Sequence, residues 1–514
     1  MKRTLPLIVV VWFAAGTFGI GQTPADRAML DKIRAEEAAH SNVVPVFEML
    51  TTNIGPRLTA SPADQKAIDF VAQTLSSYGL SDVHKEGWKF GRGWELEKLT
   101  VEMIEPRYMP IEAYADGWSA ATPSEIVAAP VFIGGKSAAD VQAMGAELKG
   151  AIVMTAPMMT NFVRTDRPQP SDPNYVPNSA AYATSAGRGQ AQPGAAGRGG
   201  PGAAAAGAPA AGAGRGGRGA GGPTVQTVLR DAGAGVLLKP SIGEHGTVFV
   251  TGRDGGPGAV PSLTLSGEHY NMIARMLEKH IAVKLRVNVQ SKFYDNDGNA
   301  YNVIAEIPGS DPVLRDEVVM IGGHLDSWHT GVGATDNADG ATTMMEAMRI
   351  LKAIDARPKR TIRVGIWAGE EQGLLGSKAY VDAHLAGDAN KTARDKFDVY
   401  YNIDNGYEPI YGFYLENNNA VRPIFDAWLE PLKSIGARRN VKEGIGSTDH
   451  LSFIAAGVPG FNPIQSYDGY DVRMHHTNMD TVERMDANDI KQAAIVMAWF
   501  AYNSANADQK IPRK

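Results

Sequence analysis

Short apolar segments alternate with longer, periodic segments in the second half of the chain, from residue 286 to residue 514. The short segments have the near-continuous character of buried strands, and the longer ones repeat apolar residues at helical spacing. Strands are predicted at 302–307, 317–321, 362–367 and 399–403, and helices at 338–354, 373–384, 421–434 and 487–503. This alternation predicts an α/β fold with a central mixed, largely parallel sheet flanked by helices.

The first half of the chain has a different pattern. Helical spacing runs through Val44, Phe47 and Leu50, stops at Ile54-Gly-Pro-Arg57 and resumes to about residue 75. Residues 88–105 then alternate between apolar and polar, as strands do. Further short β-like runs are predicted at 126–133, 151–155, 234–238 and 247–251, and a helix is predicted at 268–279. The region from about residue 118 to 283 is therefore expected to be rich in short strands.

Residues 185–223 interrupt this pattern with a segment made almost entirely of Gly, Ala and Pro, with four Arg and no acidic residue. Such a segment cannot bury enough apolar surface to offset its ordering entropy, so we predict a disordered loop. Arg-Gly repeats that bind nucleic acid are the alternative, which we disfavour for a protein outside the cell.

The N-terminus carries the pattern of an export signal. Lys2 and Arg3 precede an uncharged apolar run from Leu5 to Ile20, and small residues follow at Gly19 and Gly21. That order predicts a signal peptide over residues 1–21 and a protein that is periplasmic or secreted. A retained membrane anchor is the rival interpretation, but the run is short for a bilayer core of about 30 Å.

Composition narrows the class of protein further. The length of 514 residues favours two domains or one large domain with an insertion. The apolar content of 44% is normal for a globular protein. Its formal charge is −6, and removal of the signal with Lys2 and Arg3 leaves −8, so nucleic acid is not an expected partner. The absence of cysteine excludes thiolate metal ligands, cysteine nucleophiles and disulfides.

Residues able to bind metal gather where the predicted strands end. Gly-Gly-His324-Leu-Asp326 follows the second of these strands, Glu370 and Glu371 follow the third, and Asp404 ends the fourth. In open α/β sheets, sites form in the loops beyond the carboxyl ends of the strands. Two further positions carry similar side chains: Asp336 in a Gly-rich segment and the pair His475-His476 near the C-terminus.

Two histidines with three carboxylates suit Zn²⁺, which accepts both imidazole nitrogen and carboxylate oxygen. Hydrolysis of an amide needs an activated water and a polarised carbonyl, and bound zinc supplies both. Adjacent Glu370 and Glu371 can divide the work, one binding metal and the other accepting the proton of the water. Each of these residues alone is more often structural, so the prediction depends on their joint occurrence.

At these residues the chain resembles the zinc aminopeptidase family, most closely its carboxypeptidase Q (plasma glutamate carboxypeptidase) branch. The matching motifs are Gly322-Gly-His-Leu-Asp-Ser, Ala334-Thr-Asp-Asn-Ala-Asp-Gly, Trp367-Ala-Gly-Glu-Glu-Gln-Gly, Ile403-Asp and His476-Thr-Asn-Met-Asp-Thr. The early segment Ile54-Gly-Pro-Arg-Leu-Thr-Ala-Ser is also similar, so the resemblance covers most of the chain from about residue 41.

The resemblance implies two zinc ions, with Asp336 bridging them. His324 and Asp404 would bind one ion, and Glu371 and His476 would bind the other. Of the two adjacent histidines, the family pattern of His followed by Thr or Ser favours His476 over its neighbour.

Two catalytic roles and a backbone feature come with the same resemblance. Glu370 would be the general base, and Asp326 would steady the ring of His324. Family members often have a cis peptide bond after the bridging aspartate, which here is the Asp336–Asn337 bond.

The resemblance also implies a domain organisation. The peptidase domain would consist of residues 22–115 and 286–514, and residues 116–285 would be an inserted β-rich protease-associated domain that could act as a lid. Small peptides would be the substrates, no membrane contact is expected once the signal is removed, and a homodimer is one assembly that relatives of this branch form.

The oxyanion donor and the substrate preference stay open at this level. A tyrosine that some relatives place before the segment Thr448-Asp-His450 falls on Ile445 here, and His475, Tyr467 and Tyr470 are the nearby candidates. Arg473 is a candidate for binding a substrate carboxylate only because it is close to His476.

Three activities remain as alternatives. We favour an exopeptidase that releases N-terminal residues from short peptides or dipeptides, while aminopeptidase and carboxypeptidase or dipeptidase action are not distinguished. A glutaminyl cyclase-like transferase would need only one zinc, and a non-catalytic receptor-like protein would be expected to lack ligands or the base.

Overall fold

The computed structural model describes residues 24–170, 223–295 and 297–514. The predicted signal peptide and all but the last residue of the Gly/Ala/Arg-rich loop lie outside these ranges. Within the described residues, no helix is both long enough and apolar enough to cross a membrane.

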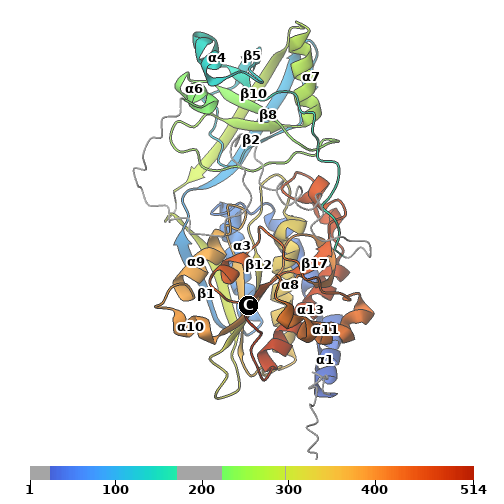
Figure 1. Cartoon of the computed structure of the whole chain (residues 1–514). Coiled ribbons are helices and arrows are strands. Elements are labelled where there is room, and N and C mark those ends of the chain that lie inside the picture. Colours follow the sequence, from blue (N-terminus) through green and yellow to red (C-terminus); the bar gives the residue numbers. More distant parts are fainter. Residues whose placement is uncertain (1–23, 171–222, 296) are drawn as a thin grey trace, which may run out of the picture.

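A six-stranded sheet forms the centre of the lower unit in Figure 1. Its strands, in spatial order, are β1 (Ser81–Lys89), β11 (Asn299–Ile307), β13 (Thr361–Trp367), β12 (Val318–His324), β14 (Phe397–Asn402) and β16 (Gly460–Phe461). β13, β12, β14 and β16 pair in parallel, whereas β1 and β11 join in antiparallel register. The predicted mixed, largely parallel sheet and its four predicted strands are confirmed.

Helices cover both faces of this sheet, because alternate strand residues point to opposite sides. Val319 and Ile321 contribute to a core with α8 (Asp339–Ala353) and α13 (Ala487–Asn506), while Met320 joins the opposite core. The first face also carries α1 (Pro24–His40), α2 (Val43–Glu48), α3 (Pro62–Ser77) and α11 (Arg422–Leu429), and the second carries α9 (Leu375–His384) and α12 (His450–Ala455). The predicted helices at 338–354, 373–384 and 487–503 are thereby confirmed.

A second unit, drawn above the first in Figure 1, contains two further sheets. One has the order β3 (Met109–Pro110), β2 (Gly93–Glu105), β10 (Lys284–Tyr294) and β5 (Ile126–Ala128). The other has the order β4 (Ala113–Ala115), β9 (Ser262–Leu265), β8 (Val236–Pro240), β7 (Ile152–Met154) and β6 (Val131–Phe132). We call the described residues from β2 to β10 the upper unit; its helices are α4 (Ala138–Ala143), α6 (Val225–Asp231) and α7 (Gly267–Glu278).

Smaller elements complete the described chain. α10 (Lys391–Lys396) precedes β14, and β15 (Tyr407–Phe413) pairs with β17 (Pro463–Ser466) in a two-stranded sheet. π-helical turns occur at Met49–Ile54, Ala334–Ala338 and Tyr470–Met474. 3₁₀-helical turns occur at Gly145–Leu148, Asn419–Val421, Glu430–Ile435 and Val482–Arg484.

Several elements differ from the sequence prediction. Residues 247–251 form no strand, because Val248 and Val250 pair with the loop at 476–478 while Thr247 and Thr251 bond elsewhere. The predicted helix at 421–434 ends as an α-helix at Leu429, and a tighter turn follows through Pro431, which cannot continue an α-helical ladder. α1 was not predicted, and among its residues 27–40, whose burial is described, Leu30 and Ile33 are the buried apolar ones.

Arg57, from the early motif, joins the N-terminal segment to the rest of the lower unit. Its fully buried guanidinium donates to the carbonyls of Leu50, Gly55, Leu325, Val332 and Gly333. Burial lowers its pKa to about 10, although nearby carboxylates favour the charged form. The residue therefore neutralises charge and satisfies backbone acceptors in one place.

We expect Arg57→Ala to lower the free energy of unfolding by about 3–5 kcal/mol, because it strands buried carbonyls and carboxylates without their partner. Chemical denaturation measured by circular dichroism would test this. Arg315→Ala is the matched control, since that side chain is 66% exposed. Equal stability of both variants would contradict the assigned role of Arg57.

Candidate metal centre

The candidate ligands meet beyond the carboxyl ends of the central parallel strands. His324 is the last residue of β12 and pairs with Trp367, the last residue of β13. Glu370 and Glu371 follow β13 after a turn through Gly369, and Asp404 follows β14. Because these strands are parallel neighbours, their ends bring the three segments to the same edge of the sheet.

The first group of side chains surrounds His324. Its Nε2 lies 3.3 Å from Asp336 Oδ1, 3.7 Å from Asp404 Oδ1 and 3.9 Å from Glu370 Oε2. His324, Glu370 and Asp404 are all buried and offer atoms within 4.8 Å of one another. The three carboxylates therefore converge on one ring nitrogen.

A second group surrounds His476. Its Nε2 lies 2.8 Å from Glu371 Oε2 and 3.5 Å from Asp336 Oδ2. His475 stacks on His476 with ring centroids 3.8 Å apart, and its Nε2 lies 3.9 Å from the same Asp336 oxygen. Both histidines thus face Asp336, but of the two only His476 also lies close to Glu371.

Asp336 lies between the two groups, with Oδ1 toward His324 and Oδ2 toward His476. The Asp336–Asn337 peptide bond is cis, as the resemblance implied. Asp480 fixes the backbone before this bond by accepting hydrogen bonds from Thr335 N, Thr335 Oγ1 and Asp336 N at 2.8, 2.9 and 3.1 Å. The sequence motif contained Asp480 without indicating this contact.

Asp326 contacts both the ring of His324 and the turn that carries Glu370 and Glu371. The ring of His324 is held by the backbone carbonyl of Asp326, 2.9 Å from Nδ1, and the carboxylate is 3.7 Å away. The carboxylate itself accepts hydrogen bonds from Thr59 Oγ1 and from the backbone N–H groups of Glu370 and Glu371, at 2.9, 3.2 and 3.3 Å. One residue therefore orients both the histidine ring and the Glu-Glu turn.

The donor set fits zinc by its chemistry and by its unsatisfied atoms. His324 Nε2, Asp336 Oδ2 and Glu371 Oε1 are buried, and none of them has a hydrogen-bond partner among the described residues. A cavity of about 10 Å³ is bordered by Trp328, Gly331, Gly333, Asp336, Glu371, His476, Thr477 and Asp480. Buried imidazole and carboxylate atoms around a space of that size suit a small cation.

Burial perturbs the titration of several of these groups. It raises the pKa of Glu370 well above its usual range; the charge of His324 opposes the shift, and those of Asp404 and Asp449 add to it. It also raises the pKa of Glu371 to about 7. Burial and the neighbouring His476 hold the pKa of His475 well below its usual range, which keeps that ring neutral. Perturbed carboxylates and imidazoles in one place are typical of catalytic sites.

The residues left open by the sequence occupy distinct surroundings. Arg473 is exposed, and Ile445 is buried in a cluster that also contains Tyr467 and Tyr470. The Tyr467 hydroxyl pairs with that of Tyr414 at 2.8 Å, and the Tyr470 hydroxyl is fully buried. The Nε2 of His475 faces Asp336, and the Tyr470 hydroxyl interacts electrostatically with Asp336 and Asp404.

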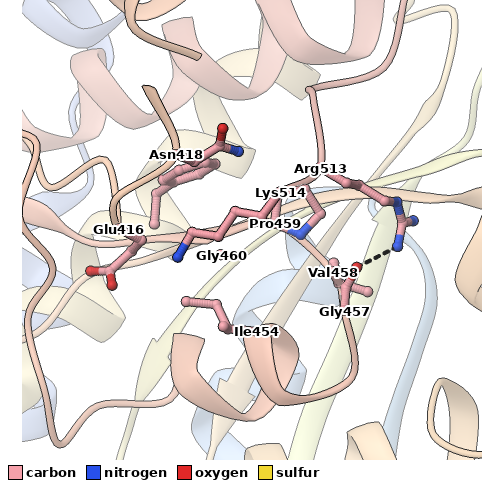
Figure 2. A pocket seen from close by; sticks show the side chains of 10 residues that line it. Glu416, Asn418, Ile454, Gly457, Val458, Pro459, Gly460, Arg513 and Lys514 are labelled. Carbon is pink, nitrogen blue, oxygen red and sulfur yellow. Dashed lines mark hydrogen bonds between the residues drawn. The ribbon is translucent and has the colours of Figure 1, made fainter. Parts of the chain in front are cut away.

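A separate hollow of about 90 Å³ is shown in Figure 2. It is lined by Glu416, Asn418, Ile454, the turn at 457–461 and the C-terminal Arg513 and Lys514. None of these residues belongs to either group of metal-type side chains. The hollow is therefore not part of the candidate centre.

The sequence of this chain is similar to those of known peptidases. Residues 302–501 match the model of peptidase family M28. Carboxypeptidase Q from Homo sapiens and from Bos taurus are each 28% identical over 465 residues, covering 90% of this chain and 85% of each relative.

Solved structures agree on the fold. A peptidase M28 precursor from Shewanella amazonensis is 24% identical with a TM-score of 0.68, covering 95% of this chain and 98% of that one. A zinc aminopeptidase from Bacillus subtilis is 19% identical with a TM-score of 0.57, covering 92% of this chain and 96% of that one. The candidate centre lies within the segment that matches the family model.

Proposed function

We propose that this chain, a zinc metallopeptidase whose residues 302–501 match peptidase family M28, is an exported di-zinc exopeptidase that acts on short peptides. Its substrates would be dipeptides or small peptides with a free N-terminus. The observation that carries the proposal is the position of Asp336, whose two oxygens face His324 and His476 separately. A carboxylate shared in this way suits a pair of metal ions.

We assign His324, Asp404 and Asp336 to one zinc ion, and His476, Glu371 and Asp336 to the other. The short distance from His476 to Glu371 supports the second set. Glu370 also lies near His324, but its oxygen is farther from the ring than those of Asp336 and Asp404. So small a difference does not separate the two roles, and the assignment of Glu370 as the base beside the ions follows from the family resemblance.

Bound zinc would polarise the scissile carbonyl and lower the pKa of the attacking water. In this mechanism the carboxylate of Glu370 accepts the proton of that water and then donates it to the leaving amine. The carboxylate of Asp326 accepts hydrogen bonds from the backbone N–H groups of Glu370 and Glu371 and so fixes this turn. The side chains of the proposed base and of the neighbouring ligand can then point in different directions. The buried surroundings raise the pKa of Glu370, and bound cations would act in the opposite direction by favouring its carboxylate form.

We further propose that His475 donates a hydrogen bond to the developing oxyanion. Its ring nitrogen faces the centre, and stacking between Tyr470 and His476 fixes the ring at centroid distances of 5.2 and 3.8 Å. A neutral imidazole donates from one ring nitrogen, so the lowered pKa of His475 is compatible with this role.

We expect His475→Ala to lower kcat by about 10²–10³-fold with zinc content retained, since loss of one oxyanion donor has that effect. Steady-state kinetics on an aminoacyl arylamide, together with metal analysis, would measure it. Tyr467→Phe is the control, because Tyr467 lies on the same loop as His475 while its hydroxyl pairs with that of Tyr414 from another segment. Unchanged kcat in His475→Ala would remove His475 from the mechanism.

The activity itself is tested by incubating purified protein with a panel of dipeptides and aminoacyl arylamides and by measuring its zinc content. The proposal expects about two zinc ions per chain and release of free amino acids. Release of pyroglutamate from N-terminal glutamine with a single ion would favour the transferase, and zinc-free protein without turnover would favour a binding protein. Blocking either end of the peptides distinguishes aminopeptidase from carboxypeptidase action.

We also infer that residues 1–21 direct export and that residues 116–285 form an inserted protease-associated domain in a peptidase domain of 22–115 and 286–514. The two sheets of the upper unit, with their own buried core, support an inserted body. The long pair β2 and β10 extends beyond residues 116–285 on both sides and connects that body to the central sheet.

A further inference from the structure

The loop that carries His475 and His476 is held by segments from the upper unit on two sides. We call residues 466–478 the histidine loop. Residues 247–252 contact one end of it, and residues 162–169, after β7, contact the other. Both segments belong to the upper unit, far from the histidine loop in sequence.

At the first contact the backbones pair directly. Val250 N donates to the carbonyl of His476 at 3.0 Å, and Phe249 forms an antiparallel bridge with Thr477. Asn478 closes the contact by accepting from Val248 N through its side chain at 2.7 Å. His476 has a left-handed backbone with φ of 62°, so these bonds hold a ligand-bearing residue in a conformation that non-glycine residues adopt rarely.

At the second contact two consecutive side chains grip the histidine loop. Asp166 accepts from Gly469 N and Val472 N at 2.9 and 3.1 Å. Arg167 forms a forked pair with Asp471, with distances of 2.5–3.0 Å, and its own backbone N–H donates to the same carboxylate. Both side chains of this pair are mostly buried, at 12% and 16% exposure.

Arg167 also reaches the second ligand-bearing segment. Its Nη1 donates to Asn405 Oδ1 at 3.2 Å, and Asn405 directly follows Asp404. The guanidinium lies over the ring of Tyr467 at 4.6 Å, and that of Tyr470 is 5.8 Å away. Tyr470 in turn stacks on His475. The guanidinium of Arg167 therefore contacts both the segment that contains Asp404 and the histidine loop, which contains His475 and His476.

We propose that Arg167 is a positioning residue of the metal centre, through which the upper unit holds the histidine loop and the Asp404 segment at the correct separation. This inference rests on the proposed zinc site. It makes the upper unit a fixed part of that site and not a lid that opens freely over it. Partners that orient metal ligands typically account for about 10–100-fold in metal affinity or activity.

The test compares Arg167→Ala and Arg167→Lys with Arg164→Ala. Arg164 is the matched control, since it lies on the same segment and pairs with Glu244, but its side chain is 62% exposed. For each folded variant, zinc affinity is measured by competition with a chromophoric chelator, and kcat and KM are measured on an arylamide. Circular dichroism establishes folding at the assay temperature.

We expect Arg167→Ala to weaken zinc binding and to lower kcat by about 10–100-fold each, because the ligand segments lose their common tether. Arg167→Lys should show part of the same losses in zinc affinity and kcat, since an ammonium group keeps the charge but cannot form the forked pair with Asp471. Arg164→Ala should match the wild type. The exchanged pair Arg167→Asp with Asp471→Arg should recover zinc affinity relative to either single change.

Two results would overturn the inference. Wild-type zinc affinity and kcat in folded Arg167→Ala would show that the contact only adds stability. Equal losses in Arg164→Ala would show a general effect of the segment. Wild-type protein that binds no zinc would instead overturn the proposed function, so the two failures are distinguishable.

Discussion

Glu370→Ala should lower kcat by about 10³-fold while the zinc content stays at the wild-type value. General bases of this kind contribute about 10²–10⁴-fold, and the proposed ligand sets do not include Glu370. Its carboxylate is buried 3.9 Å from His324 Nε2, near enough to accept a proton from a water in the centre. Steady-state kinetics and metal analysis on the same preparation would measure both quantities.

The neighbouring residue provides the contrast for this experiment. Glu371→Ala should lose both activity and zinc, because Glu371 lies 2.8 Å from His476 and belongs to the second ligand set. Zinc lost from Glu370→Ala instead would make Glu370 a ligand. Full activity in Glu370→Ala would exclude it as the base, and the division of labour between the two glutamates would be wrong.

Asp336→Ala should reduce zinc content toward zero and abolish measurable activity, the largest effect expected of any single ligand. Each of its oxygens faces a different histidine, so the change removes a ligand from both proposed ions at once. Zinc analysis after gel filtration and turnover of the arylamide are the readouts. Asp508→Ala is the control, since that side chain is 94% exposed.

Zinc removal should also lower the thermal stability of the wild-type protein. A ligand present at 100 times its dissociation constant stabilises the folded state by about 2.7 kcal/mol per site. Chelator should therefore lower the unfolding temperature of the wild type and leave that of Asp336→Ala nearly unchanged. If Asp336→Ala keeps one tightly bound zinc, Asp336 does not bridge two ions.

Much of the centre could be predicted because its residues follow strands with clear local patterns. The strands before His324, Glu370 and Asp404 are continuous apolar runs, and parallel pairing brings their ends together without further information. The two segments outside that pattern, around Asp336 and His476, were noted for their side chains, but the bridging role of Asp336 and the choice of His476 over His475 needed the family resemblance.

Other parts depend on contacts that leave no local signal. Arg167 and Asp471 are 304 positions apart, and nothing around Arg167 distinguishes it from an ordinary surface arginine. Residues 247–251 carry a strand-like pattern, but their partner is the histidine loop, and pairing with a loop cannot be read from periodicity. Asp326 was expected to steady the ring of His324, but the sequence does not indicate that its backbone carbonyl makes the short contact.

The grip of the upper unit on the histidine loop has a consequence for how the enzyme matures. The tether from Arg167 closes a segment of about 300 residues, and such distant contacts form late because loop closure must precede them. The contacts that hold the loop of His476 beside Glu371 come from both units. We therefore expect metal uptake to follow the docking of the two units, and to take place beyond the membrane if the proposed signal directs export of an unfolded chain.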